Sequence, residues 1–301
     1  MRQQLQDLLQ KRVQQYVSSS RNNNQECEKI KKKMTALDNR QAEIVKVNAK
    51  GYIDKIEKTE AEEVEHVQYH VHLQYLIKQN KHVYLEEEIE IRHAEFYKDV
   101  LVEDIEINPF QSIDLRTTVE LMEEDPFESY ERMGFQYDRL KAVRYAERWW
   151  NDYNPAYKKF EVDCTNYISQ CLHAGGAPMR GYPNRGKGWW MQNQNWSYSW
   201  SVAHSFRWFL QSSKNGLKAK SVSSPEELLL GDVICYDFEG DGRINHSTIV
   251  TGKDANGMPL VNAHTANSRM RYWAYEDSTA YTPNIQYKFF TIIDDEMGKK
   301  Y

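Results

Sequence analysis

The chain has 301 residues, 40% of them hydrophobic and 28% charged, so it can form a packed core and a hydrated surface, and its length suggests two domains. Its formal net charge of -5 argues against a nucleic-acid-binding protein, because such proteins usually present a net basic face. The N-terminus lacks the apolar run of a secretory signal, and no stretch approaches the roughly 18 apolar residues of a membrane span. We therefore expect a cytoplasmic protein with no signal peptide, no membrane span and no nucleic-acid partner.

The cysteine content points to free thiols. Four cysteines are too few for a disulfide scaffold in a chain of this length, and their spacings match no zinc motif: Cys27, Cys164, Cys171 and Cys235. A reducing compartment accounts for them most simply. We expect no bound metal and no cofactor, and nothing in the sequence indicates an oligomeric state.

Residues 1–40 are rich in Gln, Lys and Arg and predict an amphipathic helix. Its apolar positions recur at near-helical spacing: Leu5, Leu8, Leu9, Val13 and Val17. Short runs of serine and asparagine (18–20 and 22–24) predict a break. The charged run from Glu28 to Lys33 then predicts a solvated helical face.

Between Gln41 and Ile107 the hydrophobic period changes to two, which predicts strands with one hydrated face. The alternation is clearest from Val67 to Tyr75, and the segments 42–47 and 82–91 show the same pattern. Turns are predicted at two dipeptides, Lys50-Gly51 and Asn80-Lys81. Helices followed by an antiparallel meander would make residues 1–107 a small module, whose role the sequence does not indicate.

Three histidines lie on the polar face of one predicted strand: His66, His70 and His72. A metal site is one reading of this pattern. Solvated side chains are favoured instead, because no second group of ligands accompanies them. Residues 108–133 are acidic and irregular, and we expect them to form a linker between domains, with one short helix at 115–122.

The candidate catalytic residues lie after this linker. A helix is predicted from Arg139 to Tyr153, and a second begins at Asp163-Cys164 and ends at Gly175-Gly176. Asp163 is a typical N-cap residue, which places Cys164 in the first helical turn. There the helix dipole and the unpaired N–H groups lower the pKa of a thiol, and the Cys164 amide could form half of an oxyanion hole.

A thiolate nucleophile also needs a base. His246 opens a predicted strand that follows a Gly/Asp-rich turn, and a third strand (260–265) follows the Asn256-Gly257 turn. Asn262 and His264 share one face of that third strand, and either could accept the Nδ1 proton of His246 as the third member of a triad.

Aromatic residues are concentrated between nucleophile and base. Trp189 and Trp190 follow a loop rich in Gly, Arg and Pro (181–188). Two readings are open for this pair: the indoles pack in the core, or they line a substrate groove beside the loop.

Three separated segments of this half resemble the putative amidase domain of Bacillus-type bacteria, a relative of NlpC-like and CHAP cell-wall peptidases and amidases. They begin at Asp163-Cys164, Gly231-Asp232 and Asn245-His246, in the family's order, and the match covers roughly Gly134 to Tyr287. The resemblance implies that residues 134–301 form a papain-like cysteine hydrolase domain, in which the helix bearing the cysteine packs on an antiparallel sheet. The whole chain would then be an α+β protein.

The resemblance also implies site residues. Cys164 and His246 fall on the nucleophile and base positions. The family pattern favours His264 as the third residue, and Asn262 is the alternative when positions are counted as in NlpC-like enzymes. In relatives a tyrosine upstream of the cysteine lines the oxyanion site, and Tyr153 and Tyr157 are the nearby candidates.

The activity implied is hydrolysis of an amide bond in peptidoglycan-type peptides, with a peptide or muropeptide as substrate. The rival expectations are a non-catalytic peptide- or peptidoglycan-binding module and an acyltransferase on the same fold. A cell-wall substrate fits a chain without a signal peptide if that substrate is a recycled muropeptide or a spore component, or if lysis, as in sporulation, brings the protein to the wall.

Overall fold

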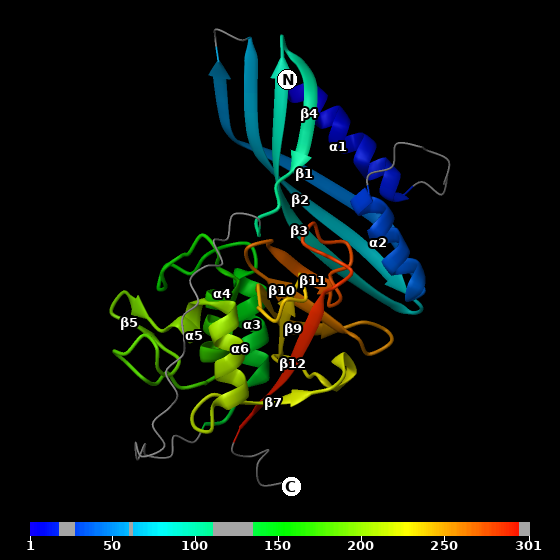
Figure 1. The fold of residues 1–301 in the computed structure, drawn as a ribbon. Coiled ribbons are helices and arrows are strands. Elements are labelled where there is room, and N and C mark those ends of the chain that lie inside the picture. The colour runs from blue at the N-terminus through cyan, green and yellow to red at the C-terminus, as the bar shows by residue number, and fades with distance from the viewer. Residues whose placement is uncertain (18–27, 60–62, 111–134, 295–301) are drawn as a thin grey trace. The chain divides into compact units, whose positions relative to one another are not determined.

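The computed structural model describes residues 1–17, 28–59, 63–110 and 135–294, which form two compact units (Figure 1). The first unit comprises residues 1–109, 254–256 and 266–281, and the second comprises the other described residues. Both units combine helices with antiparallel strands, so the α+β prediction is confirmed. Most of the predicted linker 108–133, including its helix at 115–122, lies outside the described residues. No described helix is long and apolar enough to cross a membrane.

The first unit is built on long antiparallel strands in the order β1-β2-β3-β11, with β4 paired to another part of β3. The period-two pattern is confirmed, since the residues that alternate from Val67 to Tyr75 are buried on one face. The strands are β1 (Ala42–Thr59), β2 (Val64–Gln79), β3 (His82–Tyr97), β4 (Val100–Glu106) and β11 (Ser268–Tyr272).

One of the two predicted turns is correct. Asn80 and Lys81 connect β2 to β3, and Asn80 has the positive φ of 55° that such tight hairpins need. The turn predicted at Lys50-Gly51 is wrong, because β1 continues through both residues and Gly51 pairs with Val71. A Cβ at Gly51 would lie 3.0 Å from Leu9 Cδ1, so this glycine lets a helix approach the strand closely.

Two helices pack on the inner face of these strands: α1 (Arg2–Val17) and α2 (Glu28–Asn39). The predicted apolar stripe of α1 is right at Leu5 and Leu9, which are buried, but wrong at Val17, which is 48% exposed. Arg12 and Tyr16 are buried in its place. The physical reason is that the strands beneath this part of α1 present carboxylates.

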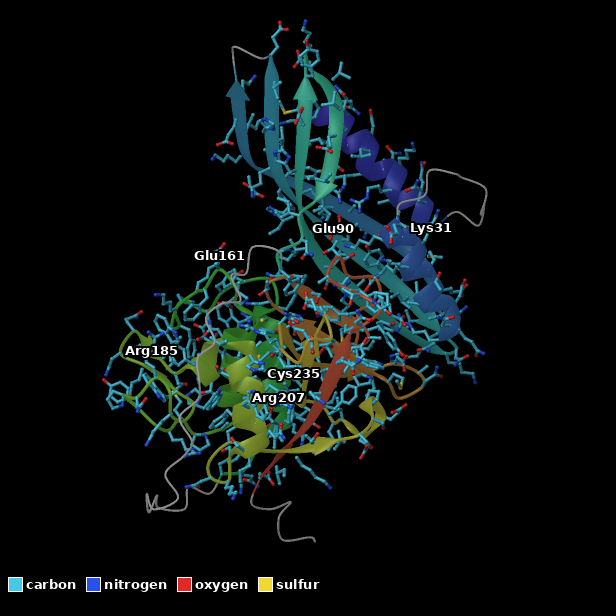
Figure 2. The ribbon with its side chains drawn as sticks, in the orientation of Figure 1. Lys31, Glu90, Glu161, Arg185, Arg207 and Cys235 are labelled. Carbon is cyan, nitrogen blue, oxygen red and sulfur yellow. The ribbon has the colours of Figure 1, made fainter. Side chains whose placement is uncertain are left out.

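The prediction of a solvated face for 28–33 is also corrected. Lys29 and Lys33 are buried, whereas Lys31 of the same helix is exposed (Figure 2). Lys29 Nζ lies 2.7 Å from a Glu90 carboxylate oxygen of β3, and Lys33 Nζ lies 2.6 Å from Glu86. Burial of these ammonium groups is tolerated because each is paired with carboxylates.

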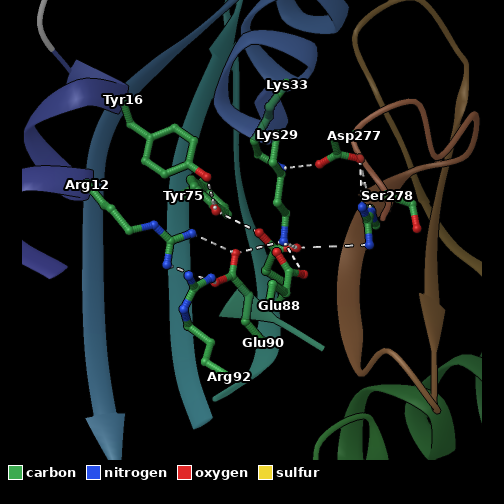
Figure 3. A network of polar contacts seen from close by, with 12 residues as sticks. Arg12, Tyr16, Lys29, Lys33, Tyr75, Glu88, Glu90, Arg92, Asp277 and Ser278 are labelled. Atoms are coloured by element: carbon green, nitrogen blue, oxygen red, sulfur yellow. Dashed lines mark hydrogen bonds and ion pairs between the residues drawn. The ribbon is translucent and has the colours of Figure 1, made fainter. Parts of the chain in front are cut away.

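These contacts belong to a buried polar network that holds the helices to β3 (Figure 3). Glu90 is at its centre: it receives two hydrogen bonds from Arg12, at 2.9 and 3.0 Å, and one from Arg92. Although burial alone would raise the pKa of Glu90, the charges of Lys29 and Arg12 hold it well below its usual value. Asp277 extends the network by pairing with Lys33 and Arg271.

The opposite face of the same strands carries the three histidines. His70 Nδ1 lies 2.8 Å from Asp54, His72 Nε2 lies 2.8 Å from Glu87, and the His66 ring stacks on His93. Among the described residues no group of three His, Cys, Asp or Glu side chains could hold a metal ion. These histidines therefore form local pairs across strands.

Glu87 makes the folding stability of the chain depend on pH. Burial opposes its ionisation, but hydrogen bonds from His72, Gln74 and Arg269 lower its pKa from 4.5 to about 2. A pKa depressed on folding contributes stability that is complete above about pH 4.5 and is lost as the pH falls towards 2. Between pH 5 and pH 2.5, we expect the free energy of unfolding in urea to fall less for Glu87→Gln than for the wild type. An equal fall in both proteins would contradict this prediction.

The second unit places helices against an antiparallel sheet in the order β10-β9-β8-β12-β7. Its buried core contains the inner faces of α3, α4 and α6 together with residues of β8, β9 and β12. The helices are α3 (Arg139–Trp149), α4 (Cys164–Ala174), α5 (Tyr198–Ser201), α6 (Ala203–Ser212) and the 3-10 turn η1 (Pro225–Glu227). The strands are β7 (Lys218–Val222), β8 (Val233–Asp237), β9 (His246–Lys253), β10 (Pro259–Ala263), β12 (Gln286–Ile293) and the hairpin β5 (Met191–Gln192) and β6 (Asn195–Trp196).

The Gly231-Asp232 pair anchors the start of β8. The buried Asp232 carboxylate accepts hydrogen bonds from the backbone of Leu229 and Ile292 and from the Arg139 guanidinium of α3. Gly231 has a φ of 82°, and a Cβ there would lie 2.9 Å from the Tyr137 hydroxyl oxygen. This motif therefore links the start of β8 to β12 and to α3. The start of β9 pairs with β8, the strand that the motif holds in place.

Candidate active site

Cys164 is the first residue of α4, as the sequence predicts. The helix exists because Ile168, Cys171 and Leu172 bury one stripe, and it ends where Gly176 adopts a φ of 103°. Asp163 occupies the N-cap position, but its side chain makes no capping hydrogen bond, contrary to our expectation. Its carboxylate instead accepts from the Phe160 amide, from Asn166 and from a distant histidine.

The Cys164 thiol is buried, with the residue 1% exposed. Burial raises its pKa, while the Thr165 hydroxyl, whose oxygen lies 3.8 Å from the sulfur, acts to lower it. The pKa lowering expected from the helix N-terminus is thus outweighed by desolvation.

The backbone N–H groups at the start of α4 converge on one oxygen. The amides of Asp163 and Cys164 both donate to Thr265 Oγ1, each at 3.1 Å. The Cys164 amide, expected to be available for an oxyanion, is therefore already bonded. It can serve a substrate oxygen only if Thr265 moves away.

His246 is the first residue of β9 and pairs with Tyr236 of β8. It is fully buried, and its ring stacks on Phe238 and meets the edge of Phe110, with centroid distances of 6.0 and 5.0 Å. The helix that Cys164 begins, α4, packs against the strand that His246 begins. The fold therefore brings the cysteine to the beginning of the strand that carries His246.

The two candidates for the third residue are held by other groups. Asn262 lies opposite Ile249, donates to Glu147 at 2.8 Å and accepts from Thr251 at 2.7 Å. Its partner Ile249 is three residues after His246 in β9, so Asn262 does not lie opposite His246 as we expected.

His264 is bonded through both ring nitrogens. Nδ1 lies 2.8 Å from the Asp163 carboxylate, Nε2 lies 2.6 Å from the Trp149 carbonyl oxygen, and the ring stacks on Tyr167 at 4.0 Å. Both partners are acceptors, so the two contacts are made together only by a ring that carries both hydrogens. The hydrogen bonds of His264 thus lead to the residue before the cysteine rather than to His246.

Of the two readings open for Trp189 and Trp190, the structure shows packing in the core. Trp189 and Trp190 are buried, and their indole N–H groups donate to Ser169 and to the carbonyls of Asn184 and Lys187. With their surfaces covered and their donors bonded, they present nothing to a ligand. Tyr157 is half-buried and stacks on Trp200 at 6.1 Å, so it is the expected binding residue that remains near the surface.

We expect Trp189→Phe to act on stability alone. The change removes the hydrogen bond to Ser169 and part of a buried ring, which costs about 1–3 kcal/mol of unfolding free energy. Urea unfolding, together with the KM of any amide substrate, checks this expectation. A raised KM at unchanged stability would show that Trp189 contacts the substrate after all.

Two residues around the cysteine have roles that the sequence analysis did not predict: Asp163, expected to be a helix cap, and Thr265, which was only the last residue of the predicted strand 260–265. The Thr265 hydroxyl contacts the backbone of Asp163 although the two residues are 102 positions apart in the chain. A polar residue next to a candidate nucleophile was the available signal for Asp163. No local pattern marks Thr265.

Comparison with known proteins identifies the family of the chain. The family model described as "Putative amidase domain" matches residues 136–290, and the chain belongs to this family. The chain is 53% identical over 270 residues to the uncharacterized protein YhbB of Bacillus subtilis, covering 88% of this chain and 86% of that protein. It is 31% identical over 140 residues to the uncharacterized protein YjcM of the same organism, covering 44% and 31%. No solved structure matches.

Proposed function

We propose that the chain is a cysteine amidase that hydrolyses an amide bond, with Cys164 as nucleophile and His246 as base on a papain-like domain spanning residues 134–301. One observation carries the proposal: Cys164 begins α4, His246 begins β9, and this helix packs against this strand. Membership of a family described as an amidase domain supports the reaction class.

The proposed reaction proceeds in two steps. His246 takes the proton of Cys164 as the sulfur attacks the amide carbonyl carbon, and the C–N bond then breaks as His246 returns that proton to the leaving amine. Water, deprotonated by His246, attacks the thioester carbonyl and releases the acid, while Cys164 recovers a proton. A buried thiol without a permanent charge suits this scheme, because the charge develops only during attack.

We assign His264 and Asp163 to the positioning of the nucleophile rather than to a triad. Asp163 links the His264 ring to the N-terminus of α4, and the Trp149 carbonyl links the same ring to the end of α3. These contacts tie the start of α4 to the end of α3 and so fix the position of Cys164. That precision matters, because small displacements of a catalytic group lower rates strongly.

For the substrate we propose a peptidoglycan-type peptide, either a recycled muropeptide in the cytoplasm or wall material reached after lysis. The N-terminal module of residues 1–107 has no assigned role in this scheme. The relevant test incubates the full chain with soluble muropeptides and follows new amine and acid termini by mass spectrometry. We expect one cleaved amide bond; uptake of an added amine in place of water would instead indicate an acyltransferase, and no product would favour a binding module.

A further inference from the structure

Two loops beside the start of α4 hold cations over a half-buried tryptophan. Lys158 belongs to the loop that precedes Cys164, and its Nζ lies 4.4 Å from the ring centroid of Trp196. Arg185 belongs to the loop 181–188, and its Cζ lies 4.8 Å from the ring centroid of the same tryptophan. We call Lys158, Arg185 and Trp196 the cationic patch. All three residues belong to the second unit of the chain.

The patch lies at the N-terminal end of α4, where the candidate nucleophile is found. In the first turn of this helix the Asn166 side chain donates to the Lys158 carbonyl at 3.0 Å. The Phe160 amide donates to the Asp163 carboxylate at 2.9 Å, and the Phe160 ring meets Trp196 edge to face at 4.8 Å. These contacts fix the patch close to the candidate nucleophile.

Arg185 is held in place by its own loop. Its carbonyl accepts from the Tyr198 amide at 2.8 Å, and its Nε donates to the Trp196 carbonyl at 3.1 Å. Arg180 and Trp189 close the base of the loop with two backbone hydrogen bonds, at 3.0 and 2.9 Å. The guanidinium therefore presents its terminal NH2 groups from a fixed backbone, which suits the two oxygens of a carboxylate.

The two cations of the patch have no acidic partner within the described ranges, since neither Lys158 nor Arg185 forms an ion pair with a carboxylate there. Glu161, the acidic residue closest in sequence to Lys158, is exposed, and Figure 2 shows it apart from Arg185. Contact with a ring face leaves the N–H groups of a cation free to donate. Two neighbouring positive charges repel each other, and a bound anion would offset that repulsion.

We propose that the cationic patch binds a carboxylate of the substrate, so that the chain acts on an amide bond in an acidic peptide. This inference rests on the proposed amidase function and names its substrate class. A further cation lies at the same end of α4: Lys159 Nζ is 3.8 Å from the Tyr153 ring centroid, and that ring meets His264. The surroundings of the nucleophile are therefore suited to a negatively charged peptide.

The test measures binding without turnover, by isothermal titration calorimetry of the full chain carrying Cys164→Ala. The probes are a soluble muropeptide with free peptide carboxylates and the same molecule with those carboxylates converted to primary amides. We expect the free acid to bind about tenfold more tightly than its amide, and Arg185→Gln to remove that difference. Equal Kd values for the two probes, or no binding of the acid, would overturn the proposal.

Matched variants separate a local contact from a general effect of charge. Lys158→Gln, at an exposed position, should weaken binding of the acid about threefold or more and leave the fold intact. Lys220→Gln removes the same charge from an exposed position of β7 and should change the Kd by less than about twofold. An equal loss in Lys220→Gln would show that the patch is not the site.

Amide hydrolysis by the wild type is measured separately with both probes. Binding that depends on Arg185, without hydrolysis of either probe, would uphold the carboxylate site and reject the amidase function. Hydrolysis of both probes with equal KM would retain the amidase function and reject the site. A KM that is lower for the acid, and that rises in Arg185→Gln at unchanged kcat, is the result that supports both.

Discussion

Cys164→Ala is expected to lower amide hydrolysis by roughly four orders of magnitude or more, because no other group of the site can form the acyl-enzyme. Alanine suits the first turn of a helix, so the fold of α4 should be retained. The measurement is single-turnover product formation by mass spectrometry with equal concentrations of wild type and variant. Far-ultraviolet circular dichroism establishes that both are folded.

The chain offers a matched control on the same helix. Cys171 is fully buried two turns further along α4, and burial raises its pKa well above the usual value. Cys171→Ala should cost some stability but keep the rate within a few-fold. His246→Ala should lose nearly as much activity as Cys164→Ala, and the double variant should lose little more, since both act in one step. Full activity in Cys164→Ala would refute the mechanism.

Glu90→Leu is expected to destabilise the N-terminal unit by about 3–5 kcal/mol, because removing one partner leaves buried charges uncompensated. Glu90 neutralises Arg12, Lys29 and Arg92 at once, with contacts of 2.7–3.0 Å. The cations would have to remain in the interior with fewer carboxylates or expose the face of α1 to water. Urea unfolding of the full chain at pH 7, followed by circular dichroism, measures the effect.

The control for this prediction is an exposed ion pair of the same unit. Glu57 pairs with Lys55 on β1, and both side chains are more than half exposed. Glu57→Gln should therefore leave the unfolding curve unchanged, as is usual for surface pairs. If Glu90→Leu unfolds at the same urea concentration as Glu57→Gln, the network does not hold the helices to the sheet.

The strands of the N-terminal unit could be predicted because their signal is local. Alternation from Val67 to Tyr75 reports one buried face whatever lies above it. The burial of Lys29 and Lys33 could not be read from their own helix, since a charged run is ordinarily solvated. The complementary signal lay elsewhere, in Glu86, Glu88 and Glu90 repeating every second residue on the inner face of β3. The buried lysines of α2 and the buried glutamates of β3 are explained only by their pairing with each other.

The same distinction holds at the candidate site. Cys164 at a helix start and His246 at a strand start follow from local patterns, and both elements begin where predicted. The surroundings of the sulfur depend on contacts between distant segments, such as Thr265 with the amides of α4. Sequence reasoning also overestimated the effect of the helix end on the thiol, because burial is a tertiary property and here it dominates the pKa.

The most direct test of the central claim is the iodoacetamide labelling rate of each cysteine between pH 6 and pH 9, in the wild type and in His246→Ala. Cys171 and Cys235 serve as internal controls, being as buried as Cys164. We predict that Cys164 is labelled fastest throughout and that the variant slows it about tenfold or more at pH 7. Equal labelling of Cys164 in both proteins would contradict the pairing of this cysteine with His246.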